Sequence, residues 1–199
     1  MINRANLEVS EIIQKNKSYA GVYILPRYTW ATDGYRLMLV TNPRFSEDNF
    51  PATKDGEKPV KVNEMIVISK EDAEKVKKAI PKKFSMPIFK NAALLKPENG
   101  SVRFLTTNLQ DEQIITAPKL NVKPPKLRSA FPRRKPTLSL MFNINLLAPL
   151  LNAISKVLCD SNIPVVKIDV WDEETPLRIK AKNESGQKVY ALIMPIIES

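Results

Sequence analysis

Hydrophobic and polar positions repeat along the chain in three similar passages, and each passage predicts a helix followed by a group of strands. In the first, Val9, Ile12 and Ile13 mark one face of a short helix near residues 5–16. The Asp-Gly dipeptide at 33–34 is typical of a hairpin turn between two strands. The pattern places the strands of this passage at about 20–25, 28–32 and 35–41.

The second passage opens with a strand, "EMIVIS" at 64–69. Ser69, with Asp72 three residues later, predicts the N-terminal cap of a helix over 70–80. The apolar face of this helix consists of Ala73, Val76 and Ile80. Strands follow at 89–97, 101–108 and 112–119, and a turn at 98–100 joins the first two.

The third passage has the same order. "TLSLMFN" at 137–143 predicts a strand, and Asn143 or Asn145 caps a helix over 146–158 that carries a wide apolar stripe. Strands are predicted at 165–172, 176–182 and 188–196. The whole pattern indicates an α+β fold of three β-α-β-β-β units, with antiparallel sheets packed on helices and no opening strand in the first unit. Repetition at this spacing is typical of structural duplication.

Two polar, turn-rich stretches separate the three units, at 42–61 and 118–136. The second contains five prolines, which disfavour a helix or a central strand, and it carries Lys and Arg but no acidic residue. Such a stretch is either a solvated tether or a contact for nucleic acid, and the pattern leaves both open.

Composition narrows the function. The net charge of +10 on 199 residues favours a polyanionic partner such as nucleic acid, although solubility alone would also explain it. The chain has no histidine and one cysteine, which excludes Ser-His-Asp and Cys-His catalysis and His-containing metal sites. An enzyme would then depend on carboxylate, Lys or Tyr chemistry, and the sequence contains no catalytic constellation of these residues. We therefore expect neither an enzyme nor a cofactor. Apolar stretches shorter than 18 residues and the absence of a secretory signal predict a cytoplasmic protein without a membrane partner.

Three motifs then carry a resemblance to the bacterial sliding clamp, the β subunit of DNA polymerase III. "ATDGYRL" at 31–37 is similar to a signature of that family, with Tyr35 in place of its usual histidine. Phe131-Pro132 followed by basic residues resembles the end of the family's middle domain. The stretch 142–196, with Met-Pro near its end, resembles the family's last half-domain. The resemblance implies the DNA-clamp fold.

Family members contain six half-domains, whereas this pattern contains three. Motif order favours a complete clamp-like domain at 1–132 and a C-terminal half-domain at 133–199. A second pairing stays open, because 86–112 also resembles the opening half of a first domain; 61–199 would then be the complete domain and 1–45 a fragment.

In the family, the three motifs converge on a pocket between domains that takes short peptides from polymerases and repair proteins. Leu37, Ile193 and Met194 could equally be ordinary core residues of strands. Transferred by position, the groove consists of Thr32, Gly34, Tyr35, Arg36, Leu37, Pro132, Arg134, Pro176, Leu192, Ile193, Met194, Pro195 and Ile196.

The resemblance also implies contact with duplex DNA, made by basic residues that bind phosphates without reading bases. A solvated, lysine-rich helix is the alternative for the helix over 70–80. The candidate DNA contacts are Lys70, Lys75, Lys77, Lys78, Lys82, Lys83, Arg133 and Lys135.

The leading hypothesis is therefore a sliding-clamp-like protein that is not an enzyme. It would bind duplex DNA independently of sequence and tether polymerase or repair proteins through short linear peptides. Any ring would be a homo-oligomer, since three half-domains do not enclose a duplex. Two alternatives stay open: a clamp homologue without a ring that acts as a protein-interaction module or regulator, and a basic nucleic-acid-binding domain without a groove.

Overall fold

The computed structural model describes residues 1–14, 20–83, 86–159 and 163–197. Residues 15 and 16, the end of the first predicted helix, lie outside this set. The chain divides into two compact units, Met1–Arg128 (unit 1) and Ser129–Ser199 (unit 2). In the part of the chain that the structure describes, no helix is both long enough and apolar enough to cross a membrane.

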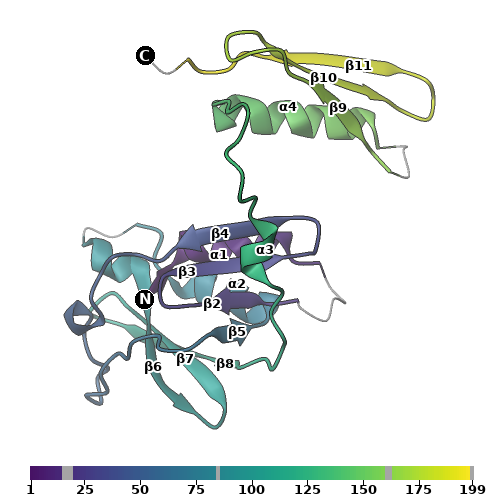
Figure 1. The fold of residues 1–199 in the computed structure, drawn as a ribbon. Helices are drawn as coiled ribbons and strands as arrows, with labels where there is room; N and C mark the ends of the chain where they lie inside the picture. The colour runs from purple at the N-terminus through teal and green to yellow at the C-terminus, as the bar shows by residue number, and fades with distance from the viewer. Residues whose placement is uncertain (15–19, 84–85, 160–162, 198–199) are drawn as a thin grey trace. The chain divides into compact units, whose positions relative to one another are not determined.

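The described residues of unit 1 form two antiparallel sheets of four strands each (Figure 1). One has the order β4-β3-β2-β5 and the other the order β1-β6-β7-β8. The strands of the first are β2 (Val22–Ile24), β3 (Tyr28–Thr32), β4 (Leu37–Thr41) and β5 (Ile66–Ile68). Those of the second are β1 (Ile2–Asn3), β6 (Asn91–Glu98), β7 (Ser101–Thr107) and β8 (Glu112–Pro118).

The two halves of unit 1 exchange their opening strands. β1 leads into the first helix, yet it pairs with β6 of the second half, with Ile2 opposite Ala92. β5 leads into the second helix, yet it pairs with β2 of the first half, with Ile68 opposite Val22. The sequence pattern predicted no opening strand in the first half, because a strand of two residues is too short to show alternation. Each sheet is therefore completed by a strand from the other half.

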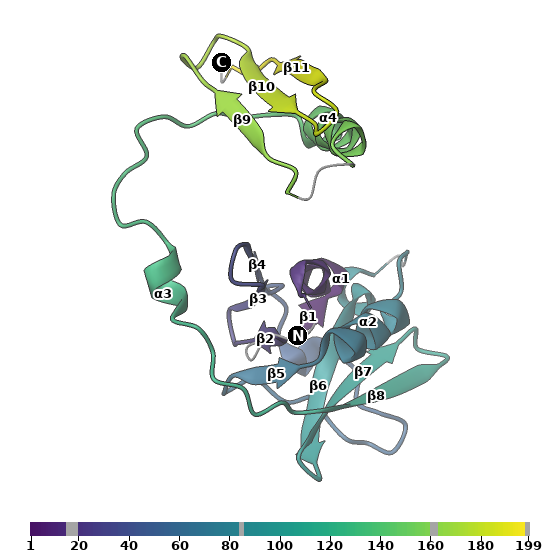
Figure 2. The same ribbon diagram turned by 90° about the vertical axis from the view of Figure 1, so that its right-hand side faces the viewer.

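The helices follow the sequence prediction to different extents. Helix α2 (Lys70–Ala79) begins as predicted, because Ser69 Oγ accepts a hydrogen bond from the Asp72 backbone N–H at 3.0 Å. The first helix is shorter than predicted: α1 (Arg4–Leu7) continues as a 3₁₀ helix, η1 (Glu8–Ile12). Helices α1 and α2 lie side by side in unit 1 (Figure 2).

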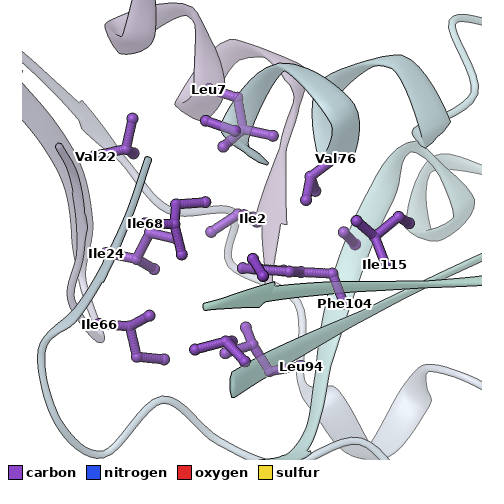
Figure 3. Close-up of a cluster of buried hydrophobic side chains, with 14 of the residues drawn as sticks. Ile2, Leu7, Val22, Ile24, Ile66, Ile68, Val76, Leu94, Phe104 and Ile115 are labelled. Atoms are coloured by element: carbon purple, nitrogen blue, oxygen red, sulfur yellow. The ribbon is translucent and has the colours of Figure 1, made fainter. Parts of the chain in front are cut away.

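The largest hydrophobic cluster of unit 1 contains side chains from both halves (Figure 3). Ile2, Leu7 and Ile24 of the first half and Val76 and Phe104 of the second are almost completely buried in it. Since side chains from both halves fill this interior, the two halves of unit 1 share a core.

Both polar stretches of the sequence contribute side chains to the packing of unit 1. In 42–61, Phe50 is buried with its ring 6.3 Å from the Phe89 ring, and a 3₁₀ helix, η2 (Glu47–Asn49), precedes it. Phe89 lies in another 3₁₀ helix, η3 (Pro87–Lys90). In 118–136, Leu120, Val122 and Leu127 pack against the outer face of the β2–β3 pair, and a short helix, α3 (Leu127–Ala130), follows. A fully solvated tether over 118–136 is therefore wrong for its first part.

Unit 2 consists of one helix on one face of a three-stranded antiparallel sheet, within its described residues (Figure 1). Ile154, Leu158 and Ile179 are at the centre of its core. The predicted strand at 137–143 is wrong, because only an isolated bridge joins Met141 to Ile196 there. The elements are α4 (Ile144–Val157), capped by Asn143, and β9 (Val166–Asp169), β10 (Leu177–Lys182) and β11 (Lys188–Ile193), in the order β11-β10-β9.

Candidate functional site

The turn between β3 and β4 is organised by a buried carboxylate. Asp33 Oδ1 accepts hydrogen bonds from the backbone N–H groups of Tyr35 and Arg36 at 2.9 and 2.7 Å. Asp33 Oδ2 accepts two more from Nε and Nη2 of Arg36, at 2.9 and 2.7 Å. Gly34 has a φ of +90°, which glycine adopts without a steric penalty. The predicted hairpin is confirmed, and its Arg36 guanidinium is held against its own turn.

Asp33 was absent from the predicted site, although Asp at the start of a tight turn is a known signal for side-chain bonds to the following backbone. Thr32 and Leu37, which were predicted, pair across the hairpin, and the Thr32 hydroxyl donates to the Arg36 carbonyl oxygen at 2.6 Å. Tyr35 is the most exposed large side chain of the turn. The turn therefore presents an exposed aromatic side chain on a hydrogen-bonded backbone.

Asp33→Asn is expected to remove a pH-dependent part of the stability of unit 1. The backbone and guanidinium bonds from Arg36, and the backbone bond from Tyr35, hold the pKa of Asp33 at about 2 against the opposing effect of burial. Because an unfolded aspartate titrates near about 3.9, this contribution is complete above that pH and is lost as the pH falls toward 2. Urea unfolding of unit 1 at pH 7, 4 and 2.5 measures it.

The variant should unfold at lower urea concentration than wild type at pH 7, and the difference should shrink at pH 2.5. Asp55→Asn, which changes an exposed carboxylate in the 42–61 stretch, is the matched control. Equal effects of the two substitutions at every pH would contradict the role of Asp33.

The groove residues predicted at the end of the chain alternate between the two sides of β11 and its continuation. Ile193 and Pro195 are buried, and Ile193 belongs to the core of unit 2. Leu192, Met194 and Ile196 are exposed. Two interpretations of Ile193 were open, a core residue of a strand or a groove residue. Its burial in the core of unit 2 agrees with the first.

The remaining predicted groove residues lie on irregular backbone of unit 2. Pro176 is half-buried just before β10, and Pro132 and Arg134 are exposed. Arg133 and Lys135, predicted as DNA contacts, are also exposed in the same stretch. The predicted groove thus has Thr32 to Leu37 on unit 1 and its other residues on unit 2.

Most predicted DNA contacts of α2 and its exit are accessible. Lys78, Lys82 and Lys83 are exposed. Lys75 is also exposed, and its Nζ lies 2.7 Å from Asp72 Oδ1. Lys70 is half-buried, with its Nζ 3.4 Å from the Ile13 carbonyl oxygen. The exposed lysines are therefore Lys75 and Lys78 on α2 and Lys82 and Lys83 after its end.

Lys77 is placed differently from this prediction. Its side chain is largely buried between the two halves of unit 1, with Nζ 3.2, 2.9 and 3.1 Å from carboxylate oxygens of Glu8, Glu11 and Glu74. Burial by itself lowers the pKa of Lys77, but hydrogen bonds to these three carboxylates outweigh it and raise the pKa above its ordinary value. Lys77 therefore joins the halves and does not face solvent.

Arg4 supports the same junction from the first half. Its guanidinium donates to the carbonyl oxygens of Lys77 and Ile80 at the end of α2, the second at 3.0 Å. The Ser10 hydroxyl donates to Glu74 Oε1 at 2.6 Å. These polar contacts were not predicted from the sequence, in which Glu8 and Glu11 lie on a helix expected near residues 5–16. Their spacing of three residues was the available signal.

No family model matches the chain, and no curated protein matches it. Solved structures do. The chain is similar to the DNA polymerase sliding clamp from Bacillus subtilis, with 16% identity and a TM-score of 0.70, over 98% of this chain and 48% of that one. It is also similar to the β subunit of DNA polymerase from Streptococcus pyogenes (11%, TM-score 0.67) and to the sliding clamp from Pseudomonas aeruginosa (15%, TM-score 0.64).

Each of these two further matches covers all of this chain and 50% or 51% of the other. The chain thus spans about half the length of the solved structures it matches. At this identity the similarity concerns the fold, and it confirms the α+β clamp fold of repeated half-domains that the motifs implied. The chain has the fold of the bacterial DNA polymerase sliding clamps.

Proposed function

We propose that this protein is a clamp-type tether that binds duplex DNA independently of sequence and holds partner proteins through short peptides. The observation that carries the proposal is the row of exposed lysines along and after α2, on a chain with the sliding-clamp fold and a net charge of +10. The lysine ammonium is a compact charge and lacks the planar pair of donors that an arginine guanidinium offers. It therefore suits contacts to phosphates, which position a protein on DNA without reading its sequence. DNA binding of this kind is not enzymatic and needs no cofactor.

For partner proteins, the proposal uses the predicted groove residues that are exposed. Tyr35 on unit 1 and Leu192, Met194 and Ile196 on unit 2 offer aromatic, aliphatic and thioether surface. Such side chains provide anchors for apolar peptide residues, and methionine adapts to varied partners. Short linear peptides of polymerases or repair proteins are the ligands proposed, and a homo-oligomer is the state in which the chain would enclose DNA.

Salt dependence of DNA binding tests the first part. We expect the full chain to bind two labelled duplexes of unrelated sequence equally, with log K falling linearly with log salt by about 0.9 per phosphate contact. The variant Lys78→Ala/Lys82→Ala/Lys83→Ala should reduce this slope by up to about 2.7. The matched control, Lys54→Ala/Lys58→Ala/Lys61→Ala, removes three exposed lysines of the 42–61 stretch. Equal loss of slope in both variants would contradict a contact through α2.

The second arm of the experiment uses a fluorescent peptide with the clamp-binding sequence of a bacterial DNA polymerase. Met194→Ala should weaken its binding by about tenfold or more, as loss of an apolar anchor does. Met86→Ala, on unit 1, removes a methionine of similar exposure and should not. Peptide binding without DNA binding would favour the alternative function, a clamp homologue that acts as an interaction module without a ring.

A further inference from the structure

We infer that unit 2 pairs with unit 2 of a second copy of this chain, each copy placing its segment 137–143 beside strand β9 of the other. This pairing would complete two half-domains in the way that the two halves of unit 1 complete each other. It rests on the geometry of units 1 and 2 taken separately, and it does not require that the chain bind DNA or peptides.

Unit 1 provides the pattern. In each half, the strand before the helix pairs with the first strand after the helix of the other half: β1 with β6, and β5 with β2. Alternate apolar residues of those receiving strands face the shared core. Val22 and Ile24 of β2 are 0% exposed, and Ala92 and Leu94 of β6 are 0% and 2% exposed.

Unit 2 has the same order of elements: an extended segment, a capped helix, and three strands. Its first strand after the helix is β9, which lies at the edge of the sheet. Val166 and Ile168 of β9 are on the face that packs on α4, because they pair with Ala181 and Ile179 of β10. They are nevertheless 40% and 51% exposed. β9 thus combines one exposed apolar face, formed by Val166 and Ile168, with an unpaired backbone edge, and proteins usually cover such an edge.

Segment 137–143 is already held as an opening strand would be. In unit 1, the Val67 carbonyl oxygen accepts a hydrogen bond from the Leu120 N–H, just after the last strand of that half, at 2.8 Å. In unit 2, the Met141 carbonyl oxygen accepts one from the Ile196 N–H, just after β11, also at 2.8 Å. Val67 and Met141 both lie two residues before the helix cap, Ser69 and Asn143.

The backbone bonds of a strand alternate between its two edges. Since Met141 bonds toward Ile196, the backbone groups of Leu140 and Phe142 point to the opposite edge, as those of Ile66 and Ile68 point to β2. Transferring the unit 1 register puts Phe142 opposite Val166, and Leu140 opposite Ile168, of the other copy.

A second copy fits this edge better than another occupant. Both opening strands of unit 1 are already paired, so among the described residues 137–143 supplies the unpaired opening segment and β9 the unpaired receiving edge. In a dimer with a two-fold axis, segment 137–143 of each copy pairs with the β9 edge of the other, so both unpaired elements of both copies are paired. The segment "TLSLMFN" carries no charge, so it can lie beside the apolar face of β9 without an unpaired ion.

The oligomeric state of the full chain tests the inference. We expect sedimentation to show a dimer at micromolar concentration. Ile168→Lys, which places a charge on the apolar face of β9, should weaken dimerisation at least tenfold. Tyr190→Lys changes an exposed aromatic residue on the opposite face of the same sheet and should leave it unchanged. A monomeric wild-type chain, or an Ile168→Lys variant that dimerises like wild type, would overturn the inference.

Disulfide trapping keeps the test decisive if Ile168→Lys fails to fold. In the transferred register Met141 lies opposite Lys167 in a non-hydrogen-bonded pair, where Cα atoms are about 4.5 Å apart and a disulfide is possible. With the exposed Cys159 replaced by serine, Met141→Cys/Lys167→Cys should give a covalent dimer under oxidation, and Met141→Cys/Lys188→Cys should not. Absence of the first dimer, or equal yield from both, contradicts the pairing. If the Ile168→Lys variant still formed an oligomer, the interface proposed at β9 would be refuted. A ring formed through other surfaces would then be the remaining explanation of the oligomer.

Discussion

Phe104→Ala is expected to lower the free energy of unfolding of unit 1 by about 3–5 kcal/mol, the usual cost of removing a fully buried phenyl ring. Phe104 is 0% exposed on β7, in the core to which both halves contribute (Figure 3). Because the cavity would open in a shared interior, the first half should lose stability together with the second. Urea unfolding followed by the fluorescence of Trp30, which lies in the first half, measures this coupling in a Trp171→Phe background.

The control is Ile114→Ala on the neighbouring strand β8. Ile114 is 38% exposed, so its truncation should cost less than about 1 kcal/mol. If Phe104→Ala shifted the circular dichroism transition but left the Trp30 transition in place, the two halves would unfold separately and the shared core would not couple them.

Lys77→Ala is the second large effect that we expect. The substitution would leave Glu8, Glu11 and Glu74 close together without their common cation. Removing the largely buried Lys77 leaves three carboxylates to repel one another, and the partial exposure of the glutamates moderates the cost. We expect a loss of about 1–3 kcal/mol in the free energy of unfolding, measured by urea unfolding at pH 7.

Lys78→Ala is the matched control, since the adjacent lysine is exposed and should change stability by less than about 0.5 kcal/mol. The two lysines should also differ in DNA binding: Lys78→Ala should lower affinity in low salt, whereas a folded Lys77→Ala variant should retain it. If Lys77→Ala lowered DNA affinity and Lys78→Ala did not, Lys77 would be a DNA contact, as the sequence pattern predicted.

Local pattern predicted much of this fold. The cap at Ser69 and the turn at Asn99-Gly100 correspond to α2 and to the β6–β7 hairpin, because both depend on residues close together in sequence. The exchange of β1 and β5 between halves was not predictable, since alternation shows that a strand exists and not which strand it joins. At 137–143 the alternation is present, but the pairing that would make a strand is absent within unit 2.

The candidate site was predictable to a similar degree. The resemblance selected the turn that contains Tyr35, yet the residue that fixes this turn, Asp33, follows from hydrogen-bond geometry. Helical periodicity put Lys77 on the solvent face of α2. It could not show that the acids of another helix would pack over that position, since this depends on how α1 and α2 meet.

The exchange of opening strands also sets an order of events during synthesis. Ile2 pairs with Ala92, which is added to the chain ninety residues later. At about 5–20 residues per second, the first strand waits several seconds for its partner. Until residue 68 is added, β2 also lacks β5, and until β6 and β7 are added the apolar side chains of the first half lack part of the shared core. Nascent chains on neighbouring ribosomes would offer each other the same strands, so unit 1 has a built-in opportunity to assemble between chains before it closes on itself.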